Sequence, residues 1–187
     1  MKMSYSFKLK SHPNKLLKEH LQEVAEIAID IYRKGNVLFE KTDIDYEKLV
    51  KILCLTHDLG KATNFFQDFR LYDKPLDNEL LGNHAALSSL FTYTLAEKFL
   101  ENQNIDQNYR KVLPFILFQI VRRHHTNLRN FEDEVPKNEA QSFSSELIKK
   151  QLTSIKDSYS DEFKELINFI AEEIDTNLDD QELLAKI

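Results

Sequence analysis

The segment "LTHDLGKATNFF", residues 55–66, places a histidine and an aspartate side by side at the end of an apolar run. The preceding stretch, "KLVKILCL" (residues 48–55), spaces its apolar residues as an amphipathic helix does. Burying an imidazole or a carboxylate without a partner is costly, because each loses its hydration. The pair His57–Asp58 therefore predicts that something cationic satisfies these groups in the interior.

Helices are expected along most of the chain. It has only 3 glycines and 4 prolines and no clear run of alternating apolar residues, so a sheet is not expected. The apolar spacing predicts helices over residues 14–34, 45–59, 83–95, 113–125, 142–156 and 161–175. Residues 126–140 are expected to be a loop, and the tail from residue 176 is weakly patterned. The fold class is therefore all-α.

Particular residues define the expected helix ends and faces. Gly60 is placed to end the second helix, and Asn83 is a good N-cap for the third. Pro114 is expected in the first turn of the fourth helix, where the N–H that a proline lacks would have no partner inside the helix. The inward stripe of the first helix is expected to contain Leu17, Val24, Ile27, Ala28 and Ile31.

Bulk properties limit the class of protein. A chain of 187 residues with 42% apolar residues can fill one core, so a single domain over residues 1–187 is expected. No apolar stretch reaches the roughly 20 residues that a membrane span requires, and the N-terminus lacks a secretory signal. The expected location is therefore the cytoplasm, where the single Cys54 is read as a reduced core residue.

The net charge and the local charge of the chain point in opposite directions on nucleic-acid binding. The formal charge of -6 weighs against binding by overall electrostatics, since such binding neutralises phosphates with Lys and Arg. Positive charge nevertheless gathers near the histidines, at Lys61, Arg122, Arg123 and Arg129. The arginines also suit the dipole at a helix C-terminus, so both interpretations stay open.

The histidines carry most of the functional information. Those that lie on the apolar face or at the end of a helix are His20, His57, His84, His124 and His125. One such histidine is ordinarily a hydrogen-bonded core residue, but five of them on four helices, with a carboxylate, predict a metal site. Asp58 has two carboxylate oxygens and could bridge two ions. Mixed imidazole and carboxylate ligands suit Mn, Fe, Co, Ni or Zn better than Ca.

Such ions point to hydrolysis. They can lower the pKa of bound water and polarise a phosphoryl oxygen, so cleavage of a phosphodiester or phosphomonoester is the natural reaction.

The pattern of these residues resembles a known family. His20, His57-Asp58, His84 and His124-His125 are similar to the HD superfamily of metal-dependent phosphohydrolases, an all-helical fold. More narrowly, "HDLGKATNFFQ", "HAALSS" and "RRHH" resemble the HD nuclease domain of the CRISPR type I nuclease-helicase, over roughly residues 8–130. The "KSHP" segment with "HLQEVAEIA" is similar to the opening of that domain.

The resemblance implies a set of metal ligands. One ion is implied to be held by His20, His57, Asp58 and a later aspartate. A second is implied to be held by Asp58, His84, His124 and His125, and the expected ions are one or two of Mn, Ni, Co, Fe or Mg. The candidates for the later aspartate are Asp157, Asp161, Asp175, Asp179 and Asp180, and none matches the family pattern convincingly. Either the chain lacks the last C-terminal helix of the domain, or a different residue serves.

The resemblance also suggests catalytic and substrate-binding residues. Asp58 and Lys61 are the catalytic candidates, and Lys61, Ser88 and Arg123 are the candidates for substrate binding. Lys61 could instead be a solvated lysine, and Ser88 a small packing residue. Thr63, Phe65, Phe66 and Gln67 also resemble the family motif, with the two phenylalanines expected in the core. His12, which precedes Pro13, is expected on the surface.

The leading hypothesis is a metal-dependent nuclease that cleaves single-stranded DNA in type I CRISPR interference, an antiviral defence. Its implied partners are a helicase, as a domain or subunit, and the CRISPR surveillance complex. The chain has no phosphate-binding G-x-x-x-x-G-K-[ST] loop, so any helicase activity lies elsewhere. Two alternatives stay open: an HD phosphohydrolase acting on nucleotides or cyclic dinucleotides, and a catalytically silent protein-binding module.

Overall fold

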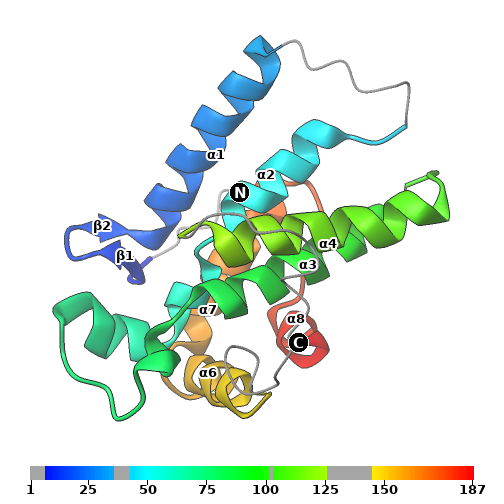
Figure 1. Cartoon of the computed structure of the whole chain (residues 1–187). Helices are drawn as coiled ribbons and strands as arrows, with labels where there is room; N and C mark the ends of the chain where they lie inside the picture. Colours follow the sequence, from blue (N-terminus) through cyan, green and yellow to red (C-terminus); the bar gives the residue numbers. More distant parts are fainter. Residues whose placement is uncertain (1–6, 36–42, 102, 126–144) are drawn as a thin grey trace.

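The computed structural model describes residues 7–35, 43–101, 103–125 and 145–187, and these are mostly helical (Figure 1). The longer helices are α1 (Leu17–Lys34), α2 (Tyr46–Thr56), α3 (Ala85–Glu101), α4 (Gln107–Arg123), α6 (Ser145–Ser158), α7 (Ser160–Glu173) and α8 (Asp180–Lys186). The expected all-α class is confirmed. The expected loop over residues 126–140 lies outside the described residues, and α8 had not been predicted from the weakly patterned tail.

A small hairpin precedes α1, where a helix had been expected from residue 14. Strand β1 (Lys10–His12) pairs antiparallel with β2 (Lys15–Leu16), and the register is irregular between Lys10 and His12. Pro13 lies between the strands, and its fixed backbone angle suits a turn better than a continuing helix.

Short turns of helix connect α2 to α3. They are the 3-10 helices Leu59–Ala62, Arg70–Tyr72 and Glu79–Gly82 and the π-helical turn Phe65–Phe69. The second helix ends at Thr56, so the prediction that Gly60 ends it is wrong. Gly60 instead lies in the first 3-10 helix, where the backbone packs closely against α3.

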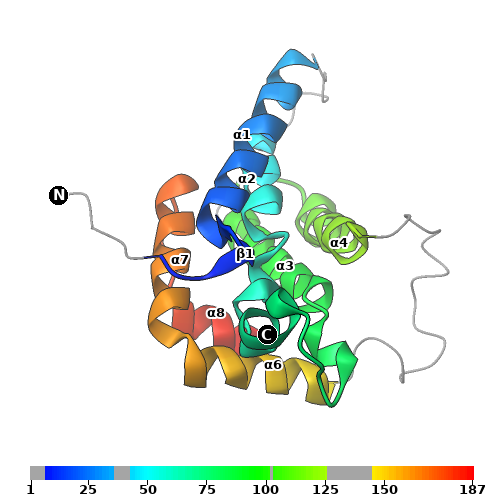
Figure 2. The same ribbon diagram turned by 90° about the vertical axis from the view of Figure 1, so that its left-hand side faces the viewer.

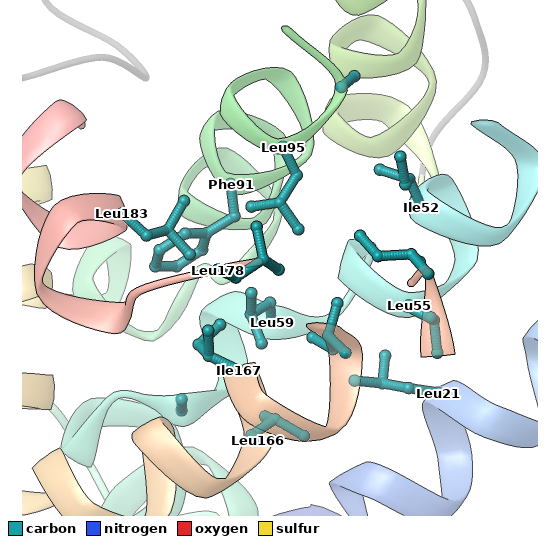
Figure 3. Packing of buried hydrophobic residues seen from close by; sticks show 14 of the residues in the cluster. Leu21, Ile52, Leu55, Leu59, Phe91, Leu95, Leu166, Ile167, Leu178 and Leu183 are labelled. Atoms are coloured by element: carbon teal, nitrogen blue, oxygen red, sulfur yellow. The ribbon is translucent and has the colours of Figure 1, made fainter. Parts of the chain in front are cut away.

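Helix α3 lies in the middle of the bundle, with α2, α4, α7 and α8 around it (Figure 1, Figure 2). It is buried on several sides, and its Phe91 ring lies 5.5 Å from the ring of Phe163 on α7. Figure 3 shows this core, where Leu55 and Leu59 from the α2 region meet residues of α3 and α7. Each such side chain stabilises the fold by about 1.5–3 kcal/mol when fully buried.

The inward face of α1 differs from the prediction. Its buried residues are Leu17, Leu21 and Ala25, whereas Ile27 is 63% exposed and Ile31 is 64% exposed. The C-terminal half of α1 extends beyond the rest of the bundle, so its apolar residues have less to pack against (Figure 1).

Helix α4 begins earlier than expected. Asp106 caps it by accepting a hydrogen bond from the Asn108 amide at 2.7 Å, and Pro114 lies inside the helix instead of in its first turn. Pro114 is buried, and α4 packs along α3 over much of its length. We attribute the tolerance of a proline here to this packing, which offsets the lost backbone hydrogen bond.

Two further expectations concern compartment and membrane. Cys54 is buried and free of any disulfide, and burial raises the pKa of its thiol to about 11. Within the described residues, no helix is both long enough and apolar enough to span a bilayer.

Candidate metal centre

The ends of several elements meet at one place, and they carry the predicted ligands. His20 lies in α1, His57 caps the C-terminus of α2, Asp58 follows it, and His84 directly precedes α3. His124 and His125 follow α4. Two groups of ligand atoms form there, each with all its atoms within 4.8 Å of one another. They are His20, His57 and Asp58, and Asp58, His84, His124 and His125.

Asp58 is common to both groups, and its side chain is only 2% exposed. Its Oδ2 atom lies 3.0 Å from His20 Nε2 and 3.6 Å from His57 Nε2. Its Oδ1 atom lies 3.0 Å from His84 Nε2 and 3.3 Å from His124 Nε2. The two oxygens of one carboxylate thus face two different sets of imidazoles.

Hydrogen bonds to the backbone define the tautomers of two histidines. His57 Nδ1 lies 2.7 Å from the carbonyl oxygen of Cys54, and His124 Nδ1 lies 2.5 Å from that of Val121. A carbonyl oxygen only accepts, so each Nδ1 carries the hydrogen. In a neutral ring the Nε2 atom then presents a lone pair toward Asp58, as in histidines that bind metals.

The pKa values of several residues in the cluster are shifted in directions that favour binding of a cation. Burial lowers the pKa of His57, and it lowers the pKa of His84 to about 4 although Asp58 acts in the opposite direction. Burial alone would raise the pKa of Asp58, but its contacts with the imidazoles of His20 and His84 hold it well below its usual range. Burial thus favours the neutral form of His57 and His84 beside an ionised Asp58 carboxylate.

Two buried atoms at the centre have no hydrogen-bond partner. They are Asp58 Oδ1 and His124 Nε2, which lie 3.3 Å apart without hydrogen-bond geometry. Two acceptors facing each other repel, and a buried polar atom without a partner is costly. A divalent cation bound by both would remove this cost. The donor set of imidazoles and one shared carboxylate therefore fits one or two transition-metal ions.

Lys61 is part of this centre. Its ammonium lies 2.8 Å from Asp58 Oδ2 and 3.4 Å from the carbonyl oxygen of Ser11, and its side chain is 7% exposed. The alternative of a solvated lysine is therefore wrong. Lys61 is held at the edge of the first group of ligands.

Ser88 has a structural partner. It is fully buried, and its hydroxyl accepts a hydrogen bond from the Gly60 amide at 2.8 Å. This contact joins the segment after Asp58 to α3, and the hydroxyls of Thr56 and Thr92 join α2 to α3 in the same way at 2.7 Å. The packing interpretation of Ser88 fits this position, and a direct substrate contact does not.

Gln67 has a positioning role that its place in the motif did not reveal. Its Nε2 donates to the carbonyl oxygens of Lys61 and Lys10, each at 2.8 Å, and its Oε1 accepts from the Lys10 amide at 3.0 Å. Gln67 is buried, so one amide ties strand β1 to the segment that carries Lys61. As expected, Phe66 is buried, whereas Phe65 is only half-buried.

The remaining candidates lie around the centre or outside it. Arg123 is the last residue of α4, next to His124, and is half-buried, while Arg129 lies outside the described residues. His12 is exposed, as expected. In the part of the chain that the structure describes, Asp58 is the only carboxylate in either group, so the late aspartate of the family has no counterpart there.

An all-helical bundle with an adjacent His-Asp pair at its centre defines an HD-domain protein. Residues 8–186 match the family model described as "Cas3, HD domain", and the chain belongs to this family. The resemblance noted in the sequence is thereby confirmed. This family consists of metal-dependent hydrolase domains of type I CRISPR systems. Comparisons with curated proteins and with solved structures gave no match.

Proposed function

We propose that this chain is a metal-dependent nuclease that hydrolyses phosphodiester bonds of single-stranded DNA during type I CRISPR interference. A helicase, as a domain or subunit, would supply the strand. The family match supports the CRISPR context, and the observation that carries the proposal is the position of Asp58 between two groups of imidazoles.

The ligand arrangement supports metal-dependent hydrolysis. His20, His57 and Asp58 would hold one ion, and Asp58, His84, His124 and His125 would hold another. Bound ions in such sites activate water and stabilise charge on a phosphoryl group. The chain's own contribution is to fix His57 and His124 through Nδ1 hydrogen bonds and to favour the neutral form of His57 and His84 through burial.

Access and charge support a phosphate-containing substrate. The His125 side chain is exposed, and those of His20 and His124 are 19% and 18% exposed, so the centre can be reached from solvent. Arg123, in the last turn of α4, brings positive charge to this edge. Lys61 adds a cation that could meet a phosphate or the charge that develops on it.

A partner fits the overall charge. The net charge of -6 gives the chain little general attraction for DNA, so we infer that grip on the strand comes largely from the helicase and the surveillance complex. The cytoplasm is the compartment in which such a complex would meet invading DNA.

The test is cleavage of labelled single-stranded DNA by protein that has been stripped of metal and then supplied with Mn, Mg, Ni or Co. Asp58→Ala and Asp58→Asn serve as matched variants, with circular dichroism to show that both fold. Duplex DNA, nucleotides and cyclic dinucleotides are assayed in parallel.

Metal-dependent cleavage of single strands that disappears in both Asp58 variants is the expected result. Equal cleavage of duplex DNA would contradict the preference for single strands. Hydrolysis of nucleotides with intact oligonucleotides would favour the small-molecule phosphohydrolase. No activity with any metal, in a protein that still binds the ions, would favour the silent module.

A further inference from the structure

The sixth histidine, His12, lies at the edge of the metal centre, although nothing in the sequence pattern assigns it a role. It is the last residue of β1, at the tip of the hairpin, and the strand register is irregular between Lys10 and His12. Such irregularities redirect side chains and are frequent beside functional sites. The His12 ring lies edge-on to the His20 ring, with centroids 5.6 Å apart.

This spacing matches the spacing inside the two ligand groups. The ring centroids of His20 and His57 are 5.2 Å apart, and the pairs of the second group range from 3.9 Å for His124–His125 to 5.6 Å for His84–His124. Imidazoles that share one ion must bring their nitrogens together while their rings stay apart, which gives separations of this size. The separation of His12 from His20 lies at the upper end of this range, close to the 5.5 Å between His57 and His124, so His12 is an immediate neighbour of the ligand cluster.

The hydrogen bonding of His12 is also like that of a ligand. Its Nδ1 lies 3.2 Å from the Ser11 hydroxyl, which donates to the Lys15 carbonyl oxygen and can therefore accept from Nδ1. A partner on Nδ1 leaves Nε2 as the nitrogen for a metal, which is the usual arrangement at metal sites.

The hairpin is fixed at its base and exposed at its tip. The base is held by Gln67, which bonds both backbone groups of Lys10, and by Lys61, whose ammonium lies 3.4 Å from the Ser11 carbonyl oxygen. His12 itself is exposed, and it lies outside the group in which all ligand atoms come within 4.8 Å. Only the tip therefore needs to move for its imidazole to reach that group.

We infer that His12 is a further protein ligand of the ion held by His20, His57 and Asp58. These three residues supply three protein ligands, and His12 would be the fourth, whereas the other group already contains four residues. The inference rests on the metal binding in the proposed function and names a residue that the family resemblance does not include. In this arrangement the hairpin positions an imidazole beside the first ion.

The test measures metal binding directly. Wild-type protein, His12→Ala and Asn14→Ala are stripped with a chelator and titrated with cobalt(II), with calorimetry for affinity and visible absorption for the ligand set of the ion. Asn14 is exposed in the same hairpin turn and serves as the matched control. His84→Ala reports on the other group.

We expect His12→Ala to weaken one cobalt site by about 10–100-fold and to change the cobalt absorption, while Asn14→Ala behaves as wild type. His84→Ala should perturb the other site, and the effects of the two variants should be separable in the double variant. Wild-type binding and spectrum in His12→Ala would overturn the inference and leave the proposed function standing. A wild-type protein that binds no cobalt would overturn both.

Discussion

The Asp58 carboxylate and the Lys61 ammonium lie 2.8 Å apart in the interior, with side chains that are 2% and 7% exposed. The i, i+3 spacing places both groups on the same side of the turn that follows α2. This contact supplies the one permanent positive charge in direct contact with Asp58 among the described residues, since its other neighbours are imidazoles.

Replacing Lys61 should therefore destabilise the metal-free protein more than the metal-loaded protein. We expect Lys61→Ala to lower its free energy of unfolding by on the order of 3 kcal/mol, because a buried carboxylate loses its fixed cation. In metal-loaded protein the loss should be smaller, since a bound ion neutralises Asp58. Urea unfolding with and without metal measures both values. Lys164→Ala, at an exposed position on α7, is the control, and an equal loss in both metal states would contradict the argument.

Gly60 should tolerate no larger side chain. A Cβ atom there would lie 2.4 Å from the His84 carbonyl oxygen and 3.0 Å from Ser88 Oγ, so the start of α3 would have to shift. Gly60→Ala is expected to cost about 1–3 kcal/mol of stability and to weaken metal binding through His84.

Gly82→Ala is the matched comparison for this variant. A Cβ atom at Gly82 would meet the flexible end of Leu76 at 3.0 Å, which can move aside. Thermal unfolding and cobalt titration of both variants should show the larger loss for Gly60→Ala. Equal stability and equal cobalt affinity of the two variants would show that the close approach of Gly60 to α3 is unimportant.

Acid should destabilise the metal-free protein. The pKa of His84 is lowered from 6.5 to about 4 in the folded state, chiefly by burial, so the unfolded chain binds a proton more readily. His84 costs no stability above pH 6.5, and the loss of stability grows as the pH falls, reaching on the order of 3 kcal/mol near pH 4. Asp58, whose pKa is also lowered, acts in the same direction at still lower pH.

Urea midpoints of metal-stripped protein across this pH range check the prediction. His84→Asn cannot titrate at this position, so its midpoint should fall less steeply between pH 6.5 and about pH 4. A wild-type midpoint that rises on acidification would have the wrong sign for a buried neutral imidazole.

Several structural features could be predicted because they depend on local chemistry. The apolar periodicity of α2 and α7 identified these helices to within a few residues. The free-energy cost of burying His57 and Asp58 indicated a cationic partner. The same reasoning predicted that His20, His84, His124 and His125 belong to the same site. The structure brings all six together in two groups.

Other features depended on packing between distant segments. Ile27 and Ile31 lie on an apolar face of α1, but Leu17, Leu21 and Ala25 are the residues that meet the core. Pro114 could not be placed inside α4 without knowing that α4 packs along α3.

By itself the sequence determined the helical class and the residues of the candidate metal centre, because periodicity and the cost of burying polar groups follow from residue types. Only the tertiary structure decided the burial of Lys61, the bond from Gly60 to Ser88 and the approach of His12 to His20. These are contacts between chain segments whose mutual distance is set by core packing, which no local pattern encodes.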